Sequence, residues 1–300
     1  MTNITREIIN TWANSIKSRT FRFNDTYSLG PATHLQEILR GIFARQGQER
    51  KMVPSNSWLW GSHFLFNNQS NLVTGSDGYD NYQAPVIDGH QLYLRRLWAK
   101  GSIRFFDVPE LNSSLHCDEH VSSVRFINEN VLVNIERNFH THLAPLLQEN
   151  RTLIYTNALH SPPPAATTTT DSSISKTINI NRDDGLAGAC LSLTPVDLLK
   201  YSMLTYNLHK IHIDTKYCHS VENLPTLVVH GPLQVTLLLY HFAIQHPELK
   251  PTQFKYRTYQ VCFVNDKLSI CVTPSDGIYD LCLFNAHDGR VYMQGQLTCQ

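Results

Sequence analysis

The sequence has no net charge and few charged residues. Its 25 basic and 25 acidic side chains cancel, and charged residues make up 17% of the 300 positions, below the roughly 25% of an average soluble chain. A neutral chain has no long-range field that attracts nucleic acid or anionic lipid, so we expect neither as a partner. The apolar content of 42% is ordinary and excludes global disorder.

Closely spaced cysteine pairs and long apolar runs are also missing. The seven cysteines lie far apart, without a CxxC pair: Cys117, Cys190, Cys218, Cys262, Cys271, Cys282 and Cys299. They indicate neither a disulfide scaffold nor a zinc ribbon, and we expect most of them to be buried thiols in a reducing compartment. Polar residues and a proline interrupt the most apolar stretch, 224–244, so no membrane-spanning helix is expected.

The length of the chain predicts about two domains. Residues 161–175 read SPPPAATTTTDSSIS, and such a run of proline and threonine cannot build a core. We therefore expect a linker or loop here, between a first domain at 1–160 and a second at 176–300.

The N-terminal segment carries apolar residues at helical spacing. Ile8, Trp12 and Ile16 recur every four residues among basic side chains, serines and threonines. This pattern fits a mitochondrial presequence of about 20 residues, and equally the first helix of the folded domain. Composition alone leaves both alternatives open.

Each half combines helices with short strands. In the first half, 32–46 has helical spacing and strands are expected at 92–106, 122–128, 131–139 and 152–157. In the second half, Thr194, Pro195 and Asp197 predict the start of a helix near 195–205, and Pro232 opens a helix at 232–245 that is apolar nearly all round.

Four more strands are expected after that helix, at 259–264, 267–273, 279–286 and 290–298, with turns at Asn265–Asp266 and Asp288–Gly289. A buried helix followed by an antiparallel meander predicts a sheet wrapped around a helix, which is the hotdog architecture. Two similar halves predict an α+β double hotdog.

Histidines gather where the second half passes from its first helix to its buried one. Residues 201–214 contain Asn207, His209, His212 and Asp214, and residues 227–234 place His230, Gly231 and Pro232 at the start of the buried helix. A helix N-terminus presents unpaired N–H groups suited to an oxyanion, glycine lets a carbonyl approach, and histidine is a general acid or base.

Three interpretations of these residues remain open. They are ordinary loop histidines, or His209, His212 and Asp214 bind a metal, or the group performs acid–base chemistry on a carbonyl compound. The metal interpretation is the weakest, because no second spaced pair and no HExxH frame accompanies them.

The segment YSMLTYNLHKIHID followed by HGPL resembles the hydratase motif of the MaoC-like (R)-specific enoyl-thioester hydratases and dehydratases. Its form is closest to the subgroup that contains mesaconyl-CoA hydratases and the fungal mitochondrial 3-hydroxyacyl-thioester dehydratase type 2. WLWGSHFLF, SDGYDNYQAPV and LRRLWAKGSIRFF in the first half resemble the N-terminal hotdog of that subgroup. The resemblance covers about residues 55–300.

The resemblance implies reversible dehydration of a (3R)-hydroxyacyl thioester to a trans-2-enoyl thioester. His212 falls on the catalytic histidine of the motif, and Gly231 would offer its N–H to the thioester carbonyl. Asn207 stands where the wider family has its catalytic aspartate, so it can orient groups but cannot take a proton. His209, His230 and Pro232 are expected substrate contacts, with His209 also a candidate helper of His212 in proton transfer. Asp214 is the nearest candidate if the subgroup relies on a carboxylate, but its position in the family pattern is usually structural.

Arg95, Arg96, Lys100 and Arg104 form a local basic cluster. It would meet an acidic acyl carrier protein or the phosphates of coenzyme A, or it is a solvated strand edge. If Arg95 and Arg96 alternate across a strand, one of them points inward and needs a partner.

The resemblance requires no metal and no other cofactor, and it implies an acyl carrier protein or coenzyme A thioester as substrate, with a homodimer as an open possibility. It also implies mitochondrial type II fatty acid synthesis, in the matrix, with the first half as an acyl-binding domain. Two alternatives remain: hydration of a short dicarboxylic enoyl-CoA, and a non-catalytic protein that binds acyl thioesters.

Overall fold

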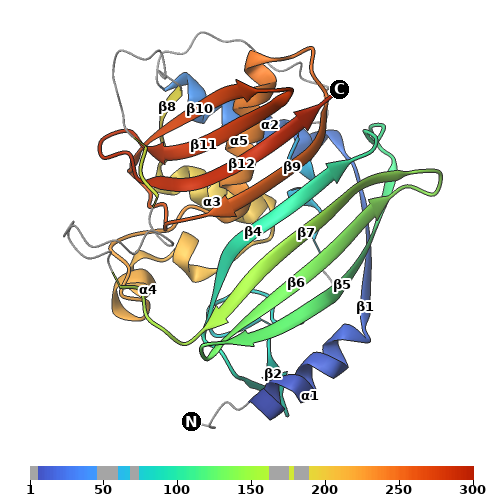
Figure 1. Ribbon diagram of the computed structural model, residues 1–300, viewed down its shortest axis with the longest axis vertical. Helices are drawn as coiled ribbons and strands as arrows, with labels where there is room; N and C mark the ends of the chain where they lie inside the picture. The colour runs from blue at the N-terminus through green and yellow to red at the C-terminus, as the bar shows by residue number, and fades with distance from the viewer. Residues whose placement is uncertain (1–5, 46–59, 68–73, 162–175, 179–188) are drawn as a thin grey trace. The chain divides into compact units, whose positions relative to one another are not determined.

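The computed structural model describes residues 6–45, 60–67, 74–161, 176–178 and 189–300. The chain divides into two compact units (Figure 1). The first unit comprises Met1–Leu29 and Phe66–Ala158, and the second comprises Gly30–Leu65 and Leu159–Gln300. The expected division at 161–175 is therefore incomplete, because Gly30–Leu65 belongs with the second unit. Residues 162–175 themselves lie outside the described residues.

The first unit is built on one antiparallel sheet with the strand order β1-β5-β6-β7-β4. Its elements are the helix α1 (Arg6–Lys17) and the strands β1 (Thr20–Thr26), β4 (Arg95–Phe105), β5 (Ser114–Ile127), β6 (Asn130–His140) and β7 (Pro145–Thr156), with a short hairpin of β2 (Val86–Ile87) and β3 (His90–Gln91). Asn128 and Glu129 connect β5 to β6, both with positive φ, as a tight two-residue hairpin turn requires.

Helix α1 is part of the core of the first unit. Ile9, Trp12, Ala13 and Ile16 are buried in a cluster with apolar residues of β5, β6 and β7. Residues 6–17 are therefore the first helix of the folded domain, and packing accounts for their amphipathic spacing.

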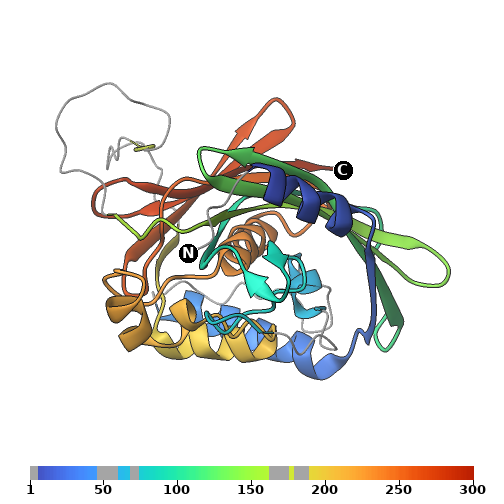
Figure 2. The ribbon, with the colours of Figure 1, turned by 90° about the horizontal axis from the view of Figure 1, so that it is seen from below.

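In the second unit, α5 lies against the antiparallel strands β10 and β11 (Figure 2). The strand order is β9-β12-β11-β10-β8. Its helices are α2 (Leu29–Ala44), a 3-10 turn η1 (Ser62–Leu65), α3 (Pro195–Leu204), a 3-10 turn η2 (Lys210–His212), α4 (Thr215–Ser220) and α5 (Gly231–Gln245); its strands are β8 (Ala189–Ser192), β9 (Pro251–Thr258), β10 (Lys267–Ser275), β11 (Ile278–Asn285) and β12 (Val291–Cys299).

The two helix starts predicted in the second unit are confirmed. Thr194 and Asp197 cap α3 reciprocally: the hydroxyl of Thr194 accepts from the Asp197 N–H, and the carboxylate of Asp197 accepts from the Thr194 N–H. Helix α5 is buried along most of its length, as its apolar circumference predicts. No helix in the described part of the chain is long and apolar enough to cross a membrane.

Helix α2 explains why the boundary between the units differs from the expected one. Phe43 packs its ring against Tyr240 and His241 of α5, with centroid distances of 5.2 and 5.9 Å. Arg45, directly after α2, pairs with Asp197 of α3 at 2.6 Å. The helix predicted at 32–46 thus exists, but its apolar face packs against the C-terminal half of the chain.

The strand predicted at 259–264 is wrong. Strand β9 ends at Thr258, and the next residues pair with the loop before α5: the Val229 N–H donates to the Cys262 carbonyl at 2.8 Å, and the Val264 N–H to the Leu227 carbonyl at 2.9 Å. Asn265–Asp266 therefore does not close a hairpin. Asp288–Gly289 does lie in the turn between β11 and β12, where Gly289 has a φ of 74°.

Candidate active site

His212 is a buried, neutral histidine held by a backbone carbonyl. It lies at the end of η2, with 6% of its surface exposed. Its Nδ1 is 2.7 Å from the carbonyl oxygen of Val228, and since a carbonyl only accepts, Nδ1 carries the proton and Nε2 keeps its lone pair. Burial lowers the pKa of His212 to about 4, although the bond to Val228 opposes the shift. The ring is therefore ready to accept a proton at neutral pH.

His230 supports the ring of His212. The two rings stack with 3.7 Å between their centroids and 26° between their planes. His230 is completely buried, and its Nε2 lies 2.8 Å from the hydroxyl oxygen of Ser202. Burial lowers the pKa of His230 well below its ordinary value, and the neighbouring His212 and His209 lower it further. Adjacent imidazoles disfavour each other's charge, so the pair stays neutral.

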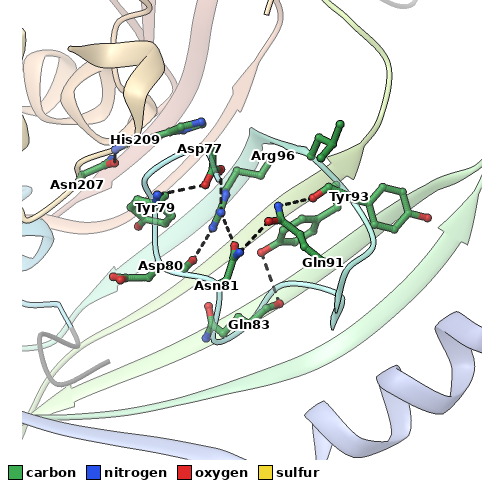
Figure 3. Close-up of polar contacts among 12 residues, drawn as sticks. Asp77, Tyr79, Asp80, Asn81, Gln83, Gln91, Tyr93, Arg96, Asn207 and His209 are labelled. Carbon is green, nitrogen blue, oxygen red and sulfur yellow. Dashed lines mark hydrogen bonds and ion pairs between the residues drawn. The ribbon is translucent and has the colours of Figure 1, made fainter. Parts of the chain in front are cut away.

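His209 and Asn207 complete this group from the loop after α3. The buried ring of His209 meets His212 edge-on, with 5.5 Å between centroids. The side-chain oxygen of Asn207 accepts from the backbone N–H of His209 at 3.3 Å, and both residues are drawn in Figure 3. Tyr206 before them adopts a positive φ of 52°. Asn207 thus shapes the loop that holds His209.

Gly231 begins α5 directly after His230, and Pro232 follows it. The first N–H groups of a helix have no carbonyl one turn earlier to bond, and they carry the positive end of the helix dipole. Because His230 stacks on His212, the fold brings the start of α5 next to the histidine group. The site therefore combines a neutral proton acceptor with a helix N-terminus suited to a developing oxyanion.

Asp214 has a structural position, as expected. It is exposed and caps α4, where its carboxylate accepts from the Tyr217 N–H at 2.9 Å. Among the residues that the structure describes, no group of three histidine, cysteine, aspartate or glutamate side chains is placed to hold a metal ion.

Arg96 points into the first unit, where three acceptors hold its guanidinium group. It pairs with Asp77 at 2.9 Å and donates to the side-chain oxygen of Asn81 and the carbonyl of Asp80, both at 2.7 Å (Figure 3). Both side chains of the pair are nearly inaccessible, with 8% and 1% exposed. Arg95 instead donates to the Asn157 carbonyl at 2.9 Å. The expected alternation is thus confirmed.

The basic cluster is consequently smaller than expected. The charge of Arg96 is neutralised by Asp77, whereas Lys100 and Arg104 are exposed. Arg95, Lys100 and Arg104 remain as basic side chains on β4.

Two features escaped the sequence reasoning. The first is Ser202, whose partner His230 is 28 residues away. The second is a buried charged network in the first unit: Arg137 pairs with Glu119 and Glu149, and Glu149 pairs with Arg151. A signal for the network exists, because the charged residues of VLVNIERNF and QENRTLIY interrupt strands that otherwise bury apolar side chains.

The fold is that of double hotdog, MaoC-like proteins. A MaoC-like dehydratase from Phytophthora capsici superposes with a TM-score of 0.68 at 13% identity, covering 96% of this chain and 97% of that chain. A Mycobacterium tuberculosis protein described as a double hotdog superposes with a TM-score of 0.53 at 14% identity, covering 94% and 95%. At these identities the likeness shows the fold, and it confirms the α+β double hotdog.

Sequence comparison identifies the family within that fold. The model of the hydroxyacyl-thioester dehydratase type 2 family, Htd2, matches residues 61–264, more than half of the chain. The mitochondrial hydroxyacyl-thioester dehydratase type 2 of Saccharomyces cerevisiae is 28% identical over 299 residues, covering 95% of this chain and all of the relative. The chain belongs to the hydroxyacyl-thioester dehydratase type 2 family, and it is a dehydratase/hydratase enzyme.

Proposed function

We propose that the enzyme reversibly dehydrates (3R)-hydroxyacyl thioesters to trans-2-enoyl thioesters, with His212 as the catalytic acid and base. The observation that carries this proposal is the neutral His212, whose proton is fixed on Nδ1 by the Val228 carbonyl so that Nε2 is a base. The name of the yeast relative supports a hydroxyacyl thioester as the substrate class.

The reaction needs one proton acceptor and one site for negative charge. In dehydration, Nε2 of His212 takes the proton from the α-carbon, and the electrons of that C–H bond form the new double bond with the β-carbon. The bond from the β-carbon to the hydroxyl breaks, and the departing oxygen takes the proton back from His212 and leaves as water. The Gly231 N–H stabilises the negative charge that develops on the thioester oxygen.

The remaining residues of the site orient the substrate in this proposal. Asn207 cannot exchange a proton, so its amide directs the β-hydroxyl or the water. His209 and Pro232 border the reacting region around His212, whereas the expected substrate contact His230 is completely buried and supports the ring of His212 instead. None of these roles requires a metal or an organic cofactor.

The carrier of the acyl group is an acyl carrier protein or coenzyme A. Arg95, Lys100 and Arg104 are the basic side chains of β4 that would meet its acidic groups or phosphates. Because Arg96 is paired with Asp77, we assign it to holding the loop at 77–81 in place. The first unit acts as the acyl-binding domain.

We place the reaction in mitochondrial type II fatty acid synthesis, in the matrix. The mitochondrial yeast relative supports the organelle.

Hydration of a trans-2-enoyl-CoA by the purified enzyme tests the proposal, followed as loss of the enoyl-thioester absorbance. We expect turnover by the wild type and a loss of about 100-fold or more in His212→Ala, the lower range for general acid–base catalysis. His219→Ala, which changes an exposed histidine on α4, is the matched control and should retain activity.

Other outcomes distinguish the alternatives. Equal turnover by His212→Ala would remove His212 from the reaction. Binding of the thioester without turnover by the wild type would indicate a non-catalytic binding protein. Preference for a carboxylated enoyl-CoA would indicate a dicarboxylic acyl hydratase, and parallel assays with the acyl carrier protein substrate compare the two carriers.

A further inference from the structure

A serine that takes no part in the proposed chemistry is hydrogen bonded beneath the catalytic histidine. Ser202 on α3 and His230 are both completely buried, and the hydroxyl oxygen of Ser202 lies 2.8 Å from Nε2 of His230. The ring of His230 also stacks on the ring of His212, with 3.7 Å between their centroids. Ser202 therefore reaches His212 through one intervening ring.

We infer that Ser202 is a positioning residue that acts on His212 through His230. This inference rests on the proposed role of His212. Rotation of the His230 ring about its side-chain bonds would break the stack, and the bond from Ser202 opposes that rotation from a neighbouring helix. His230 is the N-cap residue of α5, but its side chain makes no capping bond to the helix, so Ser202 is its hydrogen-bonding anchor in the described structure.

The surroundings of the two rings explain how this contact reaches the chemistry. His230 is faced by Tyr201 and Ser202 from α3 and by His212, while His209 lies near enough to disfavour its charge. In the described part of the chain, neither His212 nor His230 has a carboxylate partner that would stabilise an imidazolium. The pKa of His212 is therefore lowered by burial alone, and the stacked ring of His230 is one of the groups that bury it.

Histidine NMR of the ligand-free full chain tests the inference without substrate. Selective labelling of histidine reports the tautomer of His230 and the titration of His212 in wild type, Ser202→Ala and Ser202→Thr. In Ser202→Ala we expect the tautomer balance of His230 to change and the pKa of His212 to rise from about 4 toward its ordinary value, because water enters. Ser202→Thr keeps the hydroxyl and should titrate like the wild type.

Steady-state kinetics provide a second test of the inference. We expect Ser202→Ala to lower kcat about tenfold with little change in KM, a fraction of what general acid–base catalysis supplies, and to move the acidic limit of the pH profile upward. Ser220→Ala is the matched control, because that exposed hydroxyl donates only to the carbonyl of Lys216 within α4. A variant that is merely less stable has a smaller folded fraction in acid, which circular dichroism measures at each pH, and the His212 titration of its folded protein stays like that of the wild type.

The outcomes separate this inference from the proposed function. Unchanged His230 and His212 signals in Ser202→Ala would overturn the inference, as would equal behaviour of the alanine and threonine variants. If Ser202→Ala changes the NMR signals as expected but the wild type shows no turnover, the proposed function is overturned and the positioning inference stands.

Discussion

His241 offers a direct test of how burial controls histidine charge in this fold. It lies on α5 with 4% of its surface exposed and stacks on Phe43 with 14° between the rings. Neither ring nitrogen has a hydrogen-bonding partner in the described structure. Burial lowers the pKa of His241 to about 4, and His246 contributes to the shift. The native protein therefore keeps this ring neutral.

The consequence is a loss of stability in acid. In the unfolded chain, His241 becomes protonated below its ordinary pKa of about 6.5, whereas in the folded chain it becomes protonated only near pH 4. The stability contributed by neutral burial is thus complete above about pH 6.5 and falls as the pH drops toward 4. Lowering the pH from about 6.5 to about 5 covers roughly one and a half pH units, so the free energy of unfolding falls by about 2 kcal/mol.

His241→Phe removes this titration and keeps an aromatic ring against Phe43. Between about pH 7.5 and pH 5, we expect the free energy of unfolding of the wild type to fall by about 2 kcal/mol more than that of His241→Phe. His212 and His230 are present in both proteins, so their contributions cancel in the comparison. Urea unfolding at the two pH values, followed by circular dichroism, measures the difference.

The control for this experiment is His90→Phe, which places the same ring at an exposed position on β3. It should lose as much stability in acid as the wild type does. An equal acid loss in the wild type and His241→Phe would refute the reasoning, since it would mean that His241 binds its proton equally well in the folded and unfolded chain.

Three further predictions concern other parts of the molecule. The pH profile of kcat/KM for hydration should keep its activity down to about pH 5 and fall with a midpoint near the His212 pKa of about 4; a midpoint near 6.5 would contradict the buried, neutral His212. Asp77→Asn should lower the free energy of unfolding by about 3–5 kcal/mol, because Arg96 is left buried without its partner. Asp107→Asn, an exposed change, should cost less than about 0.5 kcal/mol in the same urea titration, and similar costs for both would show that the buried pair does not matter. Leu237→Ala removes a completely buried side chain of α5 and should cost about 2–5 kcal/mol, whereas Leu199→Ala, at a side chain that is 45% exposed, should shift Tm far less.

Local chemistry made several elements predictable. Thr194, Pro195 and Asp197 carry their own capping bonds, so the start of α3 follows from four adjacent residues. Helix α5 is apolar nearly all round, so we expect it to be buried on all sides, and the structure buries it along most of its length. The His212 motif and Gly231 were likewise visible, because the resemblance to the hydratase motif lies within two short segments.

The strand expected at 259–264 failed for the opposite reason. Its alternation predicted an extended strand, but alternation does not say which backbone will supply the hydrogen bonds. The loop at 227–229 supplies them, and that loop also presents the Val228 carbonyl to His212. The segment predicted as a strand therefore pairs with the loop that holds His212.

The double hotdog class and the helix predicted at 232–245 could be read from the amino-acid sequence, because both depend on periodicity or on neighbours in the chain. His212 was singled out by the resemblance of its segment to the hydratase motif. The folded structure was needed to show that α2 belongs with the second unit, that Arg96 faces Asp77, and that Ser202 contacts the His230 ring that stacks on His212. These are contacts between distant segments, and their free energy depends on which surfaces meet after folding. The motif singles out His212 for the proposed chemistry, and the packing around it sets the pKa and the orientation of its ring.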